Sequence, residues 1–268
     1  MTTITYTTRK FFISIFLIIS LLGTGNSFAQ EGDEDDWEVI LAPYLLLTNL
    51  TGTSTLGPIS GPIDLSFKDI LENFEFGFSI HAEARKNRIG LITDFTYVKL
   101  GSATDLSEGA SISAGVEIII FEAFGFYRIP LQNSDSIIDL YAGMRLWDLK
   151  FDTSFMVGEM ALQFKSTPGW VDPVIGMRTI HRVSPKWTII VRGDIGGFGV
   201  SSDFAWNIQG SIARQIGKRS HIILGYKYQH TDYNNGITGV GAFAYDAAMH
   251  GVFIGYNFSF GTKKTLVN

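Results

Sequence analysis

Histidine, and serine between glycines, are residue types that commonly act as catalytic groups or metal ligands. In this sequence neither type occurs in a catalytic motif. The five histidines are His81, His181, His221, His230 and His250, and none has the HExxH or another metal-ligand spacing. No G-x-S-x-G sequence marks the nucleophile of a hydrolase. We therefore predict no catalytic residue, no metal site and no cofactor, and we do not expect an enzyme.

A glycine-rich run from Gly193 to Gly199 resembles a phosphate-binding loop only in its glycine content. The run lacks the following Lys-Ser/Thr pair and the start of a helix, which would direct backbone amides at a phosphate. Glycines that allow a tight bend at the end of a strand are the better interpretation.

Charged and apolar residues alternate along many segments, which predicts strands with one wet face and one apolar face. From Phe74 to Arg85, aromatic and aliphatic residues occupy every second position, and Glu83 and Arg85 lie between them. Segments 187–195, 204–215 and 250–260 repeat the alternation, although the second face of the last segment carries small residues. These segments require a sheet whose two faces meet different surroundings.

We expect about ten strands, near 37–50, 74–86, 88–100, 111–128, 136–152, 168–183, 187–198, 204–215, 219–231 and 247–260, with eight or twelve as alternatives. Tight connections alternate with long ones at 51–73, 101–110, 153–167 and 232–246. Short turns on one side and long loops on the other are typical of a single all-β, antiparallel, up-and-down transmembrane β-barrel. Asp64 and the apolar residues after it predict a short helix in the first long loop.

The bulk composition agrees with a barrel. Hydrophobic residues make up 46% and aromatic residues 13% of the chain, as expected when alternate residues of each strand face lipid. The net charge of -5 argues against nucleic acid as a partner. The absence of cysteine excludes disulfides and thiolate metal sites.

The N-terminus has the pattern of a cleaved signal peptide. Arg9 and Lys10 precede an apolar run, and Ser27 and Ala29 supply the small residues before a cleavage site. The apolar run is shorter than the about 20 residues that span a bilayer as a helix. We predict a signal peptide at 1–29, an acidic tail at 30–36, an outer-membrane barrel at 37–260 and a C-terminal extension at 261–268.

If the apolar face meets lipid, the charged face must line the lumen. Charges crowded into a barrel of this size must pair with one another, because an unpaired buried charge costs several kcal/mol. The predicted lumen charge network is Glu83, Arg85, Asp94, Glu117, Asp139, Arg145, Asp172, Arg178, Arg192, Asp194 and Lys227. The predicted lipid-facing residues are Phe76, Phe78, Trp206, Tyr226, Val252, Ile254 and Tyr256.

Several segments resemble a widespread group of uncharacterised Gram-negative outer-membrane β-barrel proteins, small barrels similar in the broad sense to OmpA and OmpW. The most specific matching segments are Trp170-Val171-Asp172-Pro173 and Gly193-Asp194-Ile195-Gly196-Gly197-Phe198-Gly199. The resemblance implies a fold and an outer-membrane location, and it carries over no catalytic residue. The last strand, which ends at Phe260, is similar to the signal that the barrel-assembly machinery recognises, so lipid and that machinery are the expected partners.

Three functional hypotheses remain open from the sequence. The first is a structural or narrow-pore role in the outer membrane, with the lumen filled by paired charges. The second is an outer-membrane enzyme that modifies lipid or peptide at the barrel rim, with Asp203, Asp232 and Asp246 as candidate acids. The third is a soluble periplasmic β-barrel that binds an apolar ligand, which requires the aromatic face inside. The oligomeric state does not follow from the sequence.

Overall fold

The computed structural model describes residues 37–107, 110–132, 135–157 and 160–261. The predicted signal peptide, the acidic tail and residues 262–268 of the predicted extension lie outside these residues. The described chain forms β1 Glu38–Leu56, β2 Ile59–Leu65, α2 Phe67–Glu72, β3 Phe74–Lys86, β4 Ile89–Ser107, β5 Ala110–Ile129, β6 Ser136–Val157, β7 Met160–Ser166, β8 Gly169–Ser184, β9 Trp187–Gly196, β10 Ser202–Gln215, β11 Ser220–Asn234, the 3-10 turn η1 Gly239–Gly241 and β12 Phe243–Phe260.

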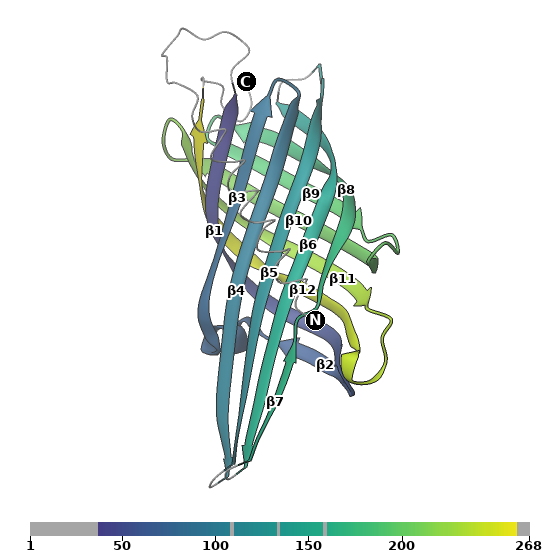
Figure 1. The fold of residues 1–268 in the computed structure, drawn as a ribbon. Coiled ribbons are helices and arrows are strands. Elements are labelled where there is room, and N and C mark those ends of the chain that lie inside the picture. Colours follow the sequence, from purple (N-terminus) through teal and green to yellow (C-terminus); the bar gives the residue numbers. More distant parts are fainter. Residues whose placement is uncertain (1–36, 108–109, 133–134, 158–159, 262–268) are drawn as a thin grey trace, which may run out of the picture. The chain divides into compact units, whose positions relative to one another are not determined.

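Antiparallel pairing closes the sheet into a barrel (Figure 1). Of the twelve strands in the sheet, β2 pairs only with β1 and β7 only with β6, which leaves ten strands in the ring. Consecutive ring strands are neighbours, and β12 returns to β1 in a register that runs from Val39 opposite Phe260 to Leu56 opposite Phe243. The prediction of an up-and-down barrel of about ten strands is confirmed.

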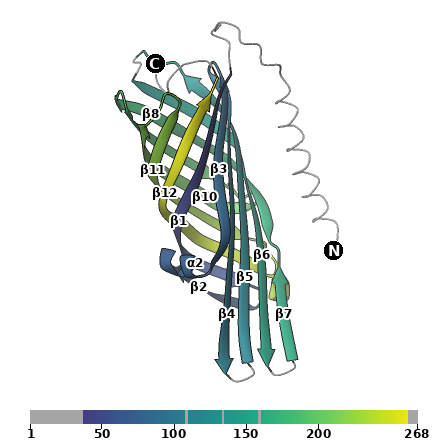
Figure 2. The ribbon, with the colours of Figure 1, turned by 90° about the vertical axis from the view of Figure 1, so that its left-hand side faces the viewer.

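The two ends of the barrel differ in their connections. At one end, which we call the turn end, β3–β4, β8–β9 and β10–β11 are joined by tight turns, and β1 begins beside the end of β12. Asn87 has a φ of 55° in the β3–β4 turn, a left-handed conformation that asparagine tolerates better than most residues. At the opposite end, which we call the loop end, residues 197–201 join β9 to β10 and residues 235–242 join β11 to β12 (Figure 2).

The predicted long loop 51–73 contains the end of β1, all of β2 and α2. The predicted long loops 101–110 and 153–167 are largely strand as well. They lengthen β4, β5 and β6 past the loop end, where β7 joins them in one sheet (Figure 1). Residues such as Ser102, Thr104 and Asp105 do not alternate with apolar ones. The prediction for 101–110 was wrong because polar residues occupy both faces there, so the segment shows no alternation. In 153–167, Met160, Leu162 and Phe164 do occupy every second position, and this alternation was missed.

The first loop contains the predicted short helix, α2, but its N-cap is Ser66 rather than Asp64. Ser66 and Asp69 form a capping box, in which each side chain accepts a hydrogen bond from the other residue's backbone N–H. The Ser66 hydroxyl and the Ser66 backbone N–H both donate to the Asp69 carboxylate, and these two hydrogen bonds hold the pKa of Asp69 below its ordinary value. In the part of the chain that the structure describes, no helix is long and apolar enough to cross a membrane.

Glycines make room for inward-facing aromatic rings at three places in the ring. Phe126 lies over Gly90, Tyr141 over Gly176, and Phe253 over Gly225. A Cβ atom on Gly176 would lie 2.5 Å from both the Tyr141 ring and the backbone oxygen of Gly193. The glycine is therefore required for the placement of Tyr141.

We expect Gly176→Val to lower the free energy of unfolding by about 1–3 kcal/mol, because the new side chain overpacks the lumen. Gly210→Val is the matched control, since Gly210 is an exposed residue of β10 and a Cβ atom added there would have no other atom within 4 Å. Urea unfolding of the barrel in detergent micelles measures both variants. Equal stability of the two variants would show that Tyr141 does not need this space.

Candidate functional site

The inward side chains of the barrel form a set of layers, which we describe from the turn end. The first is the terminal charge layer, made by Glu83, Arg128, Asp139 and Arg178. The Arg178 guanidinium donates to Glu83 at 2.6 Å and to Asp139 at 2.6 Å, and Arg128 donates to Asp139 at 2.8 Å. The two arginines balance the two carboxylates, so the layer has no net charge.

The second is the central charge layer, made by Glu122, Arg145, Arg192 and Asp194. Arg145 is fully buried and donates to Glu122 at 2.6 Å and to Asp194 at 2.8 Å. Arg192 donates to the second oxygen of Glu122 at 2.7 Å. Asp194 also accepts from the Tyr141 hydroxyl at 2.9 Å. This layer too contains two positive and two negative groups.

Aromatic rings separate the two charge layers. The Arg192 guanidinium carbon lies 5.0 Å from the centroid of the Phe124 ring, and the Arg178 carbon lies 5.3 Å from that of Phe126. Guanidinium groups over ring faces gain from cation–π attraction, which grows when water is excluded. The two rings therefore help to hold Arg178 and Arg192 in their respective layers.

An aromatic plug lies beyond the central charge layer toward the loop end, and it consists of Trp147, Trp170, Tyr233, Phe243 and Tyr245. The Trp170 ring stacks on Tyr233 with centroids 4.2 Å apart and on Trp147 with centroids 5.5 Å apart. Phe243 and Tyr245 of the last strand pack against the same cluster. Aromatic side chains thus fill much of the lumen in the loop-end half.

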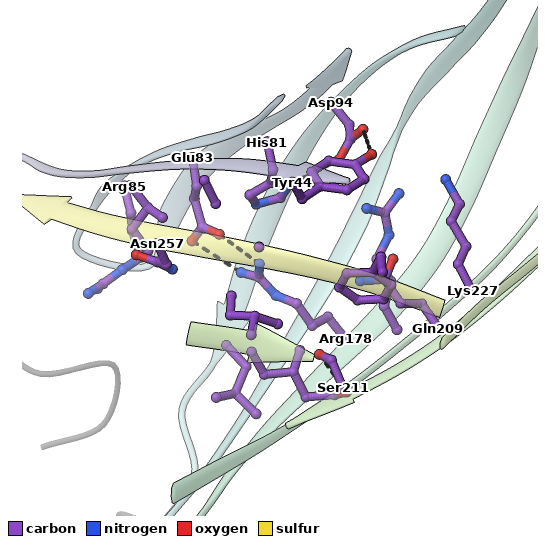
Figure 3. A pocket seen from close by; sticks show the side chains of 18 of the residues that line it. Tyr44, His81, Glu83, Arg85, Asp94, Arg178, Gln209, Ser211, Lys227 and Asn257 are labelled. Carbon is purple, nitrogen blue, oxygen red and sulfur yellow. Dashed lines mark hydrogen bonds and ion pairs between the residues drawn. The ribbon is translucent and has the colours of Figure 1, made fainter. Parts of the chain in front are cut away.

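A cavity of about 110 Å³ lies inside the turn-end half of the barrel, beside the charge layers (Figure 3). Its wall includes Glu83, Arg178 and Lys227, and also Tyr44, whose hydroxyl donates to Asp94 at 2.6 Å. The cavity has room for several water molecules. Lys227 is buried, makes no ion pair with any described residue, and is close enough to Glu122 to interact electrostatically.

Ten of the eleven residues predicted for the lumen charge network face the barrel interior. Six of them belong to the two charge layers, namely Glu83, Asp139 and Arg178 in the terminal layer and Arg145, Arg192 and Asp194 in the central layer. Asp172 accepts from the Trp170 indole and from Ser202, and Asp94 lies 3.3 Å from His81. Arg85 pairs with Glu38 at the turn end. Lys227 is the tenth.

The prediction for Glu117 is wrong. Glu117 lies on the outer face of β5 and pairs with Lys150 of β6 at 3.0 Å. Glu117 and Glu122 are an odd number of positions apart in one continuous strand, so they must point to opposite faces. The buried Arg145 and Arg192 hold Glu122 inside, and Glu117 must therefore lie outside.

The residues predicted to face lipid all lie on the outer face. Phe76, Phe78, Tyr226, Val252 and Ile254 are exposed. Trp206 and Tyr256 are half-buried because neighbouring rings cover them: Trp206 stacks on Tyr228, and Tyr256 packs on Phe258.

Sequence reasoning did not identify several residues that fill the lumen. It assigned no inward role to Glu122, Arg128, Tyr141, Trp147 or Trp170. For Glu122 a signal was available, because a lone carboxylate follows four apolar residues from Ile118 to Phe121. The aromatic plug had no comparable signal, since inward and outward aromatic residues look alike in a single strand.

The candidate acids at the rim do come together on the outer face of the loop end. Asp232 and Asp246 are direct partners in the β11–β12 register, and His230 lies 3.0 Å from Asp246. Asp203 is also close enough to Asp232 to interact with it electrostatically. Among residues with described positions, no group of three or more His, Asp or Glu side chains has the arrangement of a metal site.

Neither a protein-family model nor a curated protein matches this sequence. The chain is similar to the translocator domain of autotransporter NalP from Neisseria meningitidis, with 12% identity over 92% of this chain and 96% of that one, and a TM-score of 0.42. It is also similar to Ail, the attachment invasion locus protein of Yersinia pestis, with 10% identity over 84% and 99% of the two chains and a TM-score of 0.37. With TM-scores below 0.5, these similarities add nothing to what the strand register establishes.

Removal of one partner from the central charge layer should destabilise the barrel strongly. We expect Arg145→Ala to lower the free energy of unfolding by about 3–5 kcal/mol, because Glu122 and Asp194 would both lose a buried partner. Arg214→Ala is the control, since Arg214 is an exposed arginine of β10 that lies over the Trp187 ring. Its removal should cost less than about 1 kcal/mol. Equal losses in urea unfolding would contradict a structural role for the layer.

Proposed function

We propose that this protein is an outer-membrane β-barrel with a structural role, whose lumen does not conduct solutes. The observation that carries the proposal is the neutral central charge layer, which is buried across the middle of the barrel with the aromatic plug beyond it. Buried polar side chains adjoin these groups: Asn207 donates to Asp194 at 3.0 Å, and Gln229 and Thr231 are buried on β11. Among the described residues, the four charged side chains of the central charge layer pair with one another, and the aromatic plug contains no charged side chain. The two together therefore offer no charged path along which an ion could pass.

The outer-membrane location rests on the distribution of side chains over the two faces. Every ring strand of the barrel pairs with two neighbours, and its apolar side chains point outward along β3, β9, β10, β11 and β12. A soluble barrel that binds an apolar ligand would need the opposite arrangement, with Trp206 and Ile254 inside and Arg178 and Asp194 in water. Export through the N-terminal signal peptide and insertion by the barrel-assembly machinery belong to the same proposal.

The location is tested by cell fractionation. We expect the mature protein to start at Gln30, to remain with outer membranes through salt and alkaline washes, and to be released only by detergent. Its migration on gels should change on boiling, because a closed barrel resists unfolding in cold detergent. Recovery of the mature protein in the soluble periplasmic fraction would refute the membrane location.

The closed lumen is tested by recordings from planar bilayers. We expect no stepwise conductance from the unmodified protein. The double variant Arg145→Ala, Trp147→Ala removes one side chain from each of the two barriers and should produce steps. The matched control Trp187→Ala, Arg214→Ala removes the same two residue types from the outer face and should remain silent. Regular steps from the unmodified protein would instead support the narrow-pore form of the hypothesis.

The enzymatic alternative has one observation in its favour, the meeting of Asp232, Asp246 and His230 at the rim. The group contains general acids and bases but no hydroxyl or thiol nucleophile is hydrogen-bonded to His230 in the described structure. We therefore place it second to the structural role.

A further inference from the structure

The wall of the barrel has a seam between β1 and β3. The two strands pair from Glu38 opposite Arg85 to Tyr44 opposite Ser79, and there the pairing stops. β1 next pairs on this side with β2, beginning at Leu50. Residues 45–49 of β1 and 74–78 of β3 therefore have no strand partner across the seam among the described residues. An open sheet edge in hydrocarbon is costly and needs an explanation.

A cavity of about 80 Å³ passes through the wall at this seam. Leu45 and Phe78, which belong to the outer apolar face, line its outer part. Its inner part is lined by the inward residues Ile118, Ile120 and Met249, and Ile120 and Met249 pack in the same cluster as the aromatic plug. The cavity thus joins the lipid-facing surface to the apolar interior of the loop-end half.

Helix α2 borders the seam at its loop end (Figure 2). The Asn49 side chain of β1 accepts from the backbone N–H of Phe67 at 2.7 Å, at the start of the helix. On the other side, the backbone N–H of Gly101 donates to the carbonyl of Asn73, the C-cap of the helix, at 2.8 Å. Ile70 of the helix lines the cavity. The helix is held at both ends while the wall beneath it is unpaired.

The height of the seam places it against hydrocarbon rather than water. On the outer face, two ion pairs lie in a row across β3 to β6, Lys99 with Glu75 and Lys150 with Glu117. Lys99 is opposite Phe76 in the β3–β4 register, and Phe78 and Tyr97 lie one outward position nearer the turn end. Asp148 lies on the outer face in the same register row as Phe78 and Tyr97. Charged groups belong at the polar boundary of a bilayer, so the apolar mouth of the cavity lies at the edge of the hydrocarbon.

Polar side chains line the cavity on its turn-end side. Tyr44 lines both this cavity and the charged cavity of the turn-end half. Its hydroxyl is bonded to Asp94, and beside it the Ser79 and Thr96 hydroxyls are bonded to each other at 3.1 Å. An apolar group that enters through the seam therefore meets apolar side chains first and a satisfied polar floor last.

We infer that the β1–β3 seam is a lateral binding site that admits the acyl chain of a membrane lipid from the bilayer into the barrel wall. The occupant is an acyl chain because the mouth is continuous with the lipid-facing surface, because the lining is apolar, and because the floor offers no free charge. This site in the wall is separate from the central charge layer and the aromatic plug, whose closure of the lumen supports the proposed function.

The test is photocrosslinking in phosphatidylcholine vesicles that contain a fatty acid with a diazirine near the end of its chain. Mass spectrometry of the digested protein locates the adducts. We expect adducts on inward residues of the seam cavity, Ile118, Ile120 or Met249, besides adducts on outward residues. Val174 is buried and inward but lines neither cavity, so it should carry no adduct and sets the background.

Val98→Phe places a larger side chain in the cavity and should reduce the inward adducts to that background while the adducts on outward residues remain. Val191→Phe makes the same change on the outer face of β9 and should leave the inward adducts unchanged. If Val98→Phe does not assemble, Ile118→Phe fills the same cavity from β5. Adducts confined to outward residues in the unmodified protein would overturn the inference, whatever the bilayer recordings show.

Discussion

The pairing of guanidinium and carboxylate groups inside a narrow ring is the interaction on which the rest of this structure depends. A ten-stranded ring encloses a space only slightly larger than one that side chains fill completely. Ionised groups in such a space keep their charge only if each has a partner and further hydrogen bonds. Glu122 meets this requirement with two arginines, and Asp194 meets it with Arg145, Tyr141 and Asn207.

The charge layers and the aromatic rings depend on each other. A guanidinium group has apolar faces, so a ring above or below it can exclude water without removing its in-plane hydrogen bonds. The rings in turn need glycines opposite them, because a Cβ atom at Gly90 or Gly176 would occupy the space of Phe126 or Tyr141. Strand composition, ring placement and charge pairing therefore form one arrangement, in which a change to one part is felt by the others.

The barrel could be predicted from the sequence because a bilayer imposes a local pattern. Alternation from Phe74 to Arg85 reports lipid on one side and the lumen on the other, and such patterns located the ten ring strands, with ends that differ by up to seven residues. The extension of β4 carries no such pattern, because Ser102, Thr104 and Asp105 put polar residues on both faces, whereas β7 does alternate, with Met160, Leu162 and Phe164 at every second position. The partners within the lumen were also beyond reach, since Glu83 and Arg178 are 95 residues apart and meet only through ring closure. The prediction for Glu117 could have been corrected from the sequence, because Glu117 and Glu122 are an odd number of positions apart in one strand and must point to opposite faces.

The junction of β1 with β12 has a consequence for biogenesis. It joins the first ring strand to the last, so the cylinder cannot be completed until the final residues of the chain have been delivered. Contacts so distant in sequence form slowly, and until they form both terminal strands expose bare edges that invite aggregation. A newly made copy is therefore an incomplete sheet until its first and last ring strands have paired.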